Sequence, residues 1–209
     1  MTNHSIFRVG ESETNRVEAF SDGVLAIVIT LLVLELKVPH MPQHDDAMQW
    51  AALAALVPKI AAWVISFLFV LVFWVAHHYL FNGLQKVDRG LLWLNGLFLL
   101  FMSFVPFPTA LVGEYPASTP PLVLLSGTML GAAATFSAMR MYVLRGHGLI
   151  ASGAKAAAEM ALRRSLIAPT MYSIGLAVAF FWPWLSIAIQ LLVPAIFFLP
   201  AKAAREARG

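Results

Sequence analysis

The 209-residue sequence contains no cysteine and few charged residues. Without cysteine, the chain has no disulfide, no thiolate metal ligand and no cysteine nucleophile. Only 12% of its residues are charged, whereas a soluble domain usually carries about 25%. So few charges cannot cover a water-facing surface, and the 60% of hydrophobic residues excludes intrinsic disorder. The composition therefore predicts a polytopic membrane protein.

Sequence motifs of catalysis and nucleotide binding are also missing. There is no GxSxG elbow, no P-loop and no GxGxxG turn. His77 and His78 are adjacent, but neighbouring side chains on a helix point about 100° apart, so one metal ion cannot easily bind both. No HExxH pattern supports zinc. We therefore expect no enzyme activity, no metal site and no organic cofactor.

Apolar segments follow one another along almost the whole chain, and crossing a membrane takes roughly 20 mostly apolar residues. Six segments are candidates: Val17–Leu36, Leu53–Tyr79, Leu91–Val112, Leu122–Leu144, Leu166–Trp182 and Trp184–Leu199. The last two are short, and the Trp182-Pro183-Trp184 turn between them favours a helical hairpin over one broken span. The alanine-rich loop 146–161 is expected to extend a helix. We predict an all-α fold, with one six-helix transmembrane domain over residues 1–209 and no separate soluble domain.

The basic residues are distributed unevenly between the two ends of these spans. With six spans, both termini lie on one side, and 12 of the 14 Lys and Arg residues fall on that side. Only Lys37 and Lys59 fall on the other side. Cytoplasmic loops carry such an excess of basic residues. We therefore expect cytoplasmic termini, and we assign the net charge of +3 to topology and contact with anionic lipid rather than to nucleic acid.

Three ionisable residues, Arg16, Glu18 and Asp22, lie in the first turns of the first span. A charge at membrane depth costs roughly 2.5–3.5 kcal/mol and persists only when it is paired or hydrated. Arg16 and Glu18 can reach the interface, but Asp22 lies deeper and needs a partner. Polar residues of the next two spans lie at its level. We expect an interhelical network of Arg16, Ser21, Asp22, Trp74, one of His77 and His78, and Asn95, whose simplest role is helix packing and whose alternative role is a proton relay.

An aliphatic stripe follows Asp22 on the first span. Ile27, Leu31 and Leu34 share one face by their i, i+4, i+7 spacing, and Thr30 lies beside them. Such a stripe usually contacts lipid or other helices. Alternatively, several copies surround an axis and form a hydrophobic constriction. Glu35 would then lie at the outer mouth and raise the local concentration of cations.

A larger pattern contains these residues. The stretch Arg16-x-x-x-Phe20-Ser21-Asp22-Gly23-Val24-x-Ala26-Ile27-x-x-Thr30-Leu31-x-x-Leu34-Glu35 resembles the signature of the TMEM175 family, in its bacterial form with one six-helix repeat per chain. Phe73-Trp74-x-x-His77-His78, Asn95 and Pro106-Phe107-Pro108-Thr109 also fit. The similarity is dense in the first span, patchy in the next two and mainly topological in the last three.

The resemblance implies a potassium-permeable channel of the bacterial cytoplasmic membrane, passive and without a cofactor. It implies a homotetramer whose pore is lined by the first helix, about residues 17–36. The implied pore-facing residues are Ile27, Thr30, Leu31 and Leu34, and the implied polar network contains Arg16, Ser21, Asp22, His77 and Asn95. His77 is preferred because it follows the Trp-x-x-His spacing. The alternatives are a proton-coupled transporter that uses Asp22 and the histidines, and a membrane subunit that is an enzyme or purely structural.

Overall fold

The computed structural model describes residues 5–40, 45–146 and 148–198. These residues form nine α-helices and one short 3-10 helix, and no strand lies among them. The elements are α1 (Ser5–Val33), α2 (Asp46–Ala54), α3 (Val57–Asn82), α4 (Arg89–Phe104), α5 (Pro106–Glu114), α6 (Thr119–Arg145), the 3-10 helix Ser152–Ala154, α7 (Lys155–Ser165), α8 (Ile167–Val178) and α9 (Pro183–Phe198). The predicted all-α class is confirmed.

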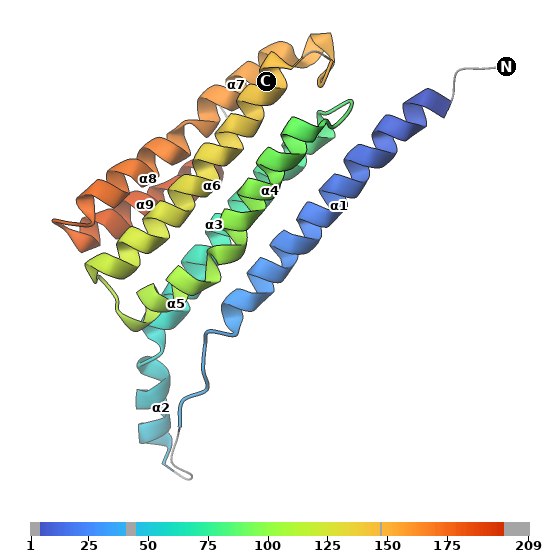
Figure 1. Ribbon diagram of the computed structural model, residues 1–209. Helices are drawn as coiled ribbons and strands as arrows, with labels where there is room; N and C mark the ends of the chain where they lie inside the picture. Colours follow the sequence, from blue (N-terminus) through green and yellow to red (C-terminus); the bar gives the residue numbers. More distant parts are fainter. Residues whose placement is uncertain (1–4, 41–44, 147, 199–209) are drawn as a thin grey trace, which may run out of the picture.

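The long helices run side by side as a bundle (Figure 1). Helix α1 lies at one edge, where it packs mainly against α3 and α4. Helix α6 packs against α4 on one side and α8 on the other. Helix α2 projects from the bundle beyond the beginning of α3. The position of α1 at an edge leaves one of its sides without a covering helix.

Prolines and aspartates explain several helix boundaries. Asp45 and Asp88 cap α2 and α4, since each side chain accepts a hydrogen bond from the backbone N–H three residues later. Pro58 lies in the first turn of α3, where its missing N–H costs nothing. Pro106 separates α4 from α5, because a proline inside a helix removes one hydrogen bond and clashes with the preceding turn.

The structure modifies the predicted spans in detail. Within the described residues, three segments are long and apolar enough to cross a membrane by themselves: Val57–Asn82, Arg89–Glu114 and Thr119–Arg145. Helix α9 is apolar but has only 16 residues, and α8 has 12. Helix α1 begins at Ser5 rather than at Val17, because polar residues can continue a helix beyond the apolar layer. Leu53 lies in the separate helix α2, so the second span begins later than expected.

The loops at one end of the bundle hold each other in place. Gln85 N–H donates to the carbonyl oxygen of Leu149 over 2.8 Å, and Leu84 forms a β-bridge with Ile150. The loop after α3 is thereby joined to the loop after α6. The expected helical extension in the loop 146–161 is confirmed by α7.

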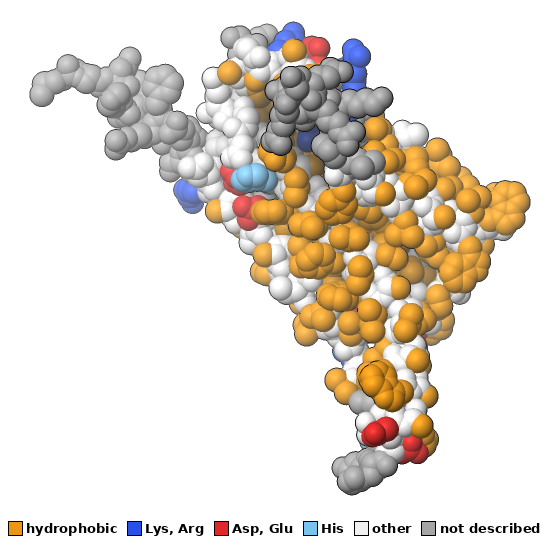
Figure 2. Space-filling view, turned by 180° about the vertical axis from the view of Figure 1, so that it is seen from behind, with side chains coloured by type: hydrophobic (Ala, Val, Ile, Leu, Met, Phe, Trp, Pro, Cys, Tyr) orange, Lys and Arg blue, Asp and Glu red, His pale blue; other side chains and the backbone are white. Residues whose placement is uncertain are grey.

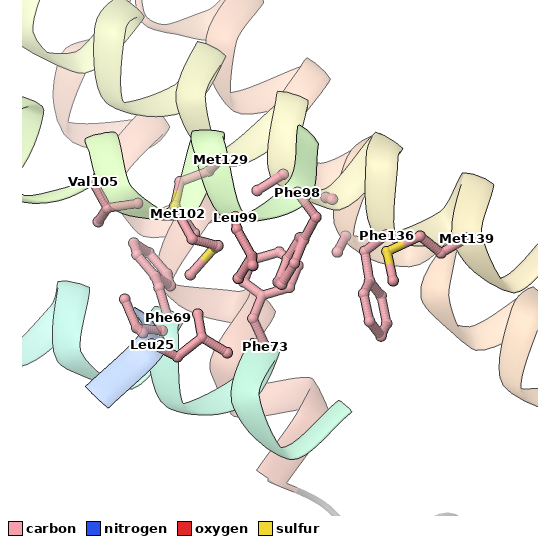
Figure 3. Packing of buried hydrophobic residues seen from close by; sticks show 14 of the residues in the cluster. Leu25, Phe69, Phe73, Phe98, Leu99, Met102, Val105, Met129, Phe136 and Met139 are labelled. Carbon is pink, nitrogen blue, oxygen red and sulfur yellow. The ribbon is translucent and has the colours of Figure 1, made fainter. Parts of the chain in front are cut away.

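The core is a stack of aromatic and aliphatic side chains between α3, α4 and α6 (Figure 3). The ring centroids of Phe73 and Phe98 are 5.7 Å apart, and those of Phe98 and Phe136 are 5.5 Å apart. Leu25 brings α1 into this cluster and is fully buried. In a membrane, such packing gains little from removal of water, so van der Waals contact and interhelical hydrogen bonds hold the helices together.

The surface agrees with a membrane setting. Figure 2 shows a broad hydrophobic region across the middle of the visible face, with charged side chains toward its two ends. Exposed apolar side chains include Leu100 at 63% and Phe181 at 77%. An apolar patch of this extent would be a liability in water, whereas acyl chains accommodate it.

Candidate functional site

Helix α1 has a buried face and an exposed face. Leu25 and Leu32 on one face are 0% exposed, since they pack against the core. On the opposite face, Phe20 is 67% exposed and Ile27 59%, and Leu34, in the turn that follows Val33, is 62% exposed. The same helix therefore anchors itself to the protomer on one side and leaves an apolar row uncovered on the other.

The predicted aliphatic stripe coincides with this uncovered face. Leu31 is 41% exposed and lies between Ile27 and Leu34 on it. Thr30 is also exposed, and its hydroxyl donates to the carbonyl oxygen of Ile27 over 2.9 Å. This bond uses the hydroxyl hydrogen and leaves the oxygen lone pairs directed away from the helix. A side chain at Gly23 would begin in open space, because nothing but the adjoining residues and backbone of α1 lies within 4 Å of that point.

On the buried side of α1, three side chains form one hydrogen-bonded chain across three helices. His77 on α3 contacts Asn95 on α4, with 2.9 Å between Nε2 and Oδ1. Asn95 Nδ2 donates to Ser21 Oγ on α1 over 2.9 Å, and Ser21 donates to the carbonyl oxygen of Val17 over 2.9 Å. All three side chains are buried. The chain thereby fixes the spacing of α1, α3 and α4.

The direction of these bonds assigns the protonation of His77. The amide oxygen of Asn95 can only accept, so Nε2 of His77 carries the hydrogen. Its Nδ1 is buried and has no hydrogen-bond partner among the described residues. The imidazole lies between the rings of Phe81, at 4.2 Å, and Phe98, at 5.8 Å. An imidazole that lies between two apolar rings and has one unpartnered nitrogen fits a neutral side chain whose role is helix packing.

Asp22 has a different partner. Trp74 Nε1 donates to Asp22 Oδ1 over 2.9 Å, joining α3 to α1. Both side chains are partly open to the outside of the protomer, and Trp74 is 36% exposed. Arg16 is exposed, and no described side chain forms a hydrogen bond or ion pair with it. The structure thus brings Ser21, Asn95 and His77 together and Asp22 with Trp74, but it brings Arg16 to neither set.

A third polar set was missing from the sequence prediction. Glu18 Oε1 lies 2.9 Å from Nδ1 of His78, and Asn82 Nδ2 lies 2.8 Å from its Nε2. Trp74 stacks on His78 with ring centroids 6.0 Å apart. The signal was available, because Trp74, His78 and Asn82 follow one another at intervals of four residues on α3. The two adjacent histidines therefore serve separate sets on separate faces.

None of these sets resembles a metal site. Within residues 5–40, 45–146 and 148–198, no group of three or more His, Asp or Glu side chains could hold a metal ion. Each set instead contains a hydrogen bond between two helices, which is the usual role of such groups within a bundle in lipid.

The end of α1 opposite to Arg16 borders a small cavity of about 170 Å³. Glu35, Lys37 and Lys59 are among the residues that line it. Lys59 on α3 forms an ion pair with Glu114 on α5. The carboxylate of Glu35 is exposed and lies just beyond the aliphatic row. Charges of both signs therefore surround this end of α1, and the ion pair neutralises one of its two lysines.

Comparison with known proteins yields a family match. Residues 16–106 match the model of the family described as the endosomal/lysosomal potassium channel TMEM175. This interval contains α1 from Arg16 onward and the three polar sets.

Relatives are similar over nearly the whole chain. A protein of Chamaesiphon minutus named a potassium channel is 35% identical over 197 residues, which are 92% of this chain and 97% of the relative. A potassium channel of a Chryseobacterium species is 34% identical over 187 residues, covering 90% of this chain and 93% of the relative. The crystal structure of a lysosomal potassium-selective channel TMEM175 homolog from Chamaesiphon minutus aligns with a TM-score of 0.79 and 34% identity, over 89% of this chain and 96% of that one.

Proposed function

Because the chain belongs to the TMEM175 family, we propose that it is a potassium-permeable channel without enzymatic activity. Ions flow passively down their electrochemical gradient through a central pore. Four copies of the chain surround this pore, and each contributes its first helix as the lining. No cofactor takes part, and potassium is the permeant ion.

The observation that carries this proposal is the uncovered row on α1. Ile27, Leu31 and Leu34 are exposed in the protomer, while Leu25 and Leu32 on the opposite face are buried against α3 and α4. A helix that lines an axis of symmetry needs such a division, because its inner face meets only water and its own copies. The position of α1 at the edge of the bundle supports this assignment (Figure 1).

The chemistry of the row suggests how the pore works. In a tetramer, each position presents four identical side chains, and rings of aliphatic side chains exclude water from a narrow passage. Ile27 is assigned the narrowest ring, with Leu31 and Leu34 as further rings. The Thr30 hydroxyl oxygen can touch a partly dehydrated ion. Because aliphatic rings do not replace a hydration shell with fixed oxygens, we expect modest selectivity.

The polar sets are assigned to assembly rather than to conduction. The chain from His77 through Asn95 to Ser21 ends on a backbone carbonyl oxygen. Because no carboxylate belongs to that chain, it offers no route for a proton from His77 to Asp22. A proton-coupled transporter that uses these residues is therefore disfavoured, and the sets hold α1 in position beside the pore.

The orientation follows from charge. We assign both termini to the cytoplasm of a bacterial cell and the channel to its cytoplasmic membrane, because 12 of the 14 basic residues lie on the side of the termini. Glu35 then lies at the outer mouth, where its negative charge attracts cations.

Reconstitution of the purified full chain in planar bilayers tests the proposal. With potassium on one side and sodium on the other, we expect a current whose reversal potential lies toward the potassium equilibrium potential. A flux that saturates and follows an imposed pH gradient would instead indicate a coupled transporter. Absence of current from protein that is folded and tetrameric by mass would indicate a structural subunit.

A further inference from the structure

Arg140 on α6 has no role in the ion pathway just described, yet it carries a charge into the bundle. It lies five residues before Arg145, the last residue of α6. At 1.5 Å per residue, the two residues are separated by about 7.5 Å along the helix axis. Arg140 is partly buried and contacts α3. From this position inside the apolar layer, a side chain as long as that of arginine can reach the lipid headgroups.

The described residues satisfy only part of the hydrogen-bonding capacity of the Arg140 guanidinium. One Nη donates to the carbonyl oxygen of Ala76 over 3.4 Å, and the group lies 5.0 Å from the centre of the Phe136 ring. Its Nε is buried without a partner among the described residues. A guanidinium has five N–H donors, so most of its donor capacity is unused. No described carboxylate lies within ion-pair distance of it.

A second guanidinium is placed on the neighbouring helix. Ser137, one turn before Arg140, donates to the carbonyl oxygen of Ser165 over 3.3 Å and so joins α6 to α7. Arg164 precedes Ser165 and donates to the carbonyl oxygen of Ile196 on α9 over 3.2 Å. Its guanidinium lies 5.4 Å from the centre of the Phe197 ring. Two arginines on α6 and α7, both contacting aromatic rings, therefore flank the same end of the bundle.

A cation at this depth needs a compensating charge, and among the described residues no carboxylate supplies one to Arg140. We propose that the phosphate of an anionic phospholipid binds there, with Arg140 as the principal ligand and Arg164 beside it. The planar fork of a guanidinium matches the oxygens of a phosphate. Phe197, which is partly exposed, provides apolar surface for the first methylenes of the acyl chains.

A lipid is favoured over a free anion because of the surroundings. Exposed apolar side chains lie beside the two arginines, since Met141 is 36% exposed and Leu166 47%, so an acyl chain gains contact that inorganic phosphate cannot. The exposed basic residues Lys155 and Arg163 lie at the same end and raise the local concentration of anionic headgroups. This inference concerns lipid binding alone and does not depend on ion conduction.

Native mass spectrometry of the full chain tests the site. The purified protein is equilibrated with equal amounts of palmitoyl-oleoyl phosphatidylglycerol and phosphatidylcholine, and the ratio of the two retained lipids is measured. We expect wild type to retain phosphatidylglycerol preferentially. Arg140→Gln should lower the ratio roughly tenfold, as the loss of a charge-assisted bond implies. The matched control Arg145→Gln removes an exposed charge from the same helix and should leave the ratio nearly unchanged.

A conservative variant separates a loss of lipid binding from a loss of folding. Arg140→Lys keeps the charge but loses the fork, so it should retain an intermediate amount of phosphatidylglycerol while its melting temperature stays close to that of wild type. Equal lipid ratios in wild type and Arg140→Gln would overturn the proposal. An equal decrease in Arg140→Gln and Arg145→Gln would also overturn it, since it would indicate diffuse attraction. Displacement of the lipid by millimolar inorganic phosphate would exclude a lipid as the preferred occupant.

Discussion

The indole Nε1 of Trp74 donates a hydrogen bond to Asp22 Oδ1 over 2.9 Å, and this bond ties α3 to α1 at the residue next to Ser21, which forms the buried contact with Asn95. The two contacts differ in their surroundings. Ser21 is 0% exposed, whereas Trp74 is 36% exposed. Helix α1 is therefore held by a bond inside the protomer as well as by contacts nearer its surface, those of Asp22 with Trp74 and of Glu18 with His78.

The bond between Trp74 and Asp22 should contribute measurably to stability. We expect a double-mutant cycle of Trp74→Phe and Asp22→Ala to give a coupling free energy of about 0.6 kcal/mol, as for other interhelical hydrogen bonds in membranes. Unfolding of the purified protein in mild detergent provides the measurement. Asp22→Ala should also lower the tetramer yield more than it lowers the conductance per channel. Strictly additive effects of the two substitutions would contradict the contact.

Ile27→Asn should widen the water-filled part of the pore. An amide at the proposed constriction lowers the cost of wetting, so single-channel conductance should increase by about twofold or more. The matched control is Leu100→Asn, because Leu100 is also an exposed aliphatic residue, 63% accessible, but lies on α4. The control should leave conductance unchanged. If Ile27→Asn left both conductance and selectivity as in wild type, Ile27 would not lie at the axis.

Thr30→Val tests the role of the hydroxyl. The substitution keeps the shape of the side chain and removes its oxygen, so the permeability ratio of potassium to sodium should change by roughly twofold. Thr170 on α8 is also exposed and donates to a backbone carbonyl oxygen in the same way, over 2.8 Å. Thr170→Val is therefore the control and should not alter bi-ionic reversal potentials. Identical ratios in wild type and Thr30→Val would remove Thr30 from the ion pathway.

His77→Gln distinguishes packing from proton transfer. The glutamine amide can donate to Asn95 as the imidazole Nε2 does, but it cannot carry a proton. We expect the variant to assemble and to conduct potassium with the same dependence on pH as wild type. His77→Leu, which lacks the donor, should instead lower the thermal stability. Loss of all transport in His77→Gln, in protein of normal stability, would support the proton-coupled alternative.

The class of the fold was predictable because it depends on composition and on the length of apolar runs. The all-α bundle, the hairpin around Pro183 and the break near Pro106 all have local causes in the sequence. The start of α1 at Ser5 was not predictable. The residues before Val17 are polar, so they continue the helix without adding to the apolar pattern that indicates it. The division between α2 and α3 was missed because residues 53–57 are apolar and conceal the boundary.

Most of the predicted polar network consists of residues that do bond to one another in the structure, but Arg16 joins neither set and the pairing of the others was not predictable. Sequence spacing places Ser21 and Asp22 side by side, yet they point in directions about 100° apart, so they contact different helices. His77 and His78 separate for the same reason. The partner of Asp22 depends on the rotation of α3 about its own axis, which only tertiary packing fixes. The spacing also gave no partner for Glu18, which lies 2.9 Å from His78 Nδ1.

Helix α1 runs from Ser5 to Val33 as one continuous helix of 29 residues without proline. If this helix lines the pore, the wall of the passage has no proline kink. Opening and closing can then turn or tilt each wall helix as a unit. The buried bond between Ser21 and Asn95 would act as the pivot. A displacement of α1 on the N-terminal side of Ser21 would then move Ile27, which lies on the other side.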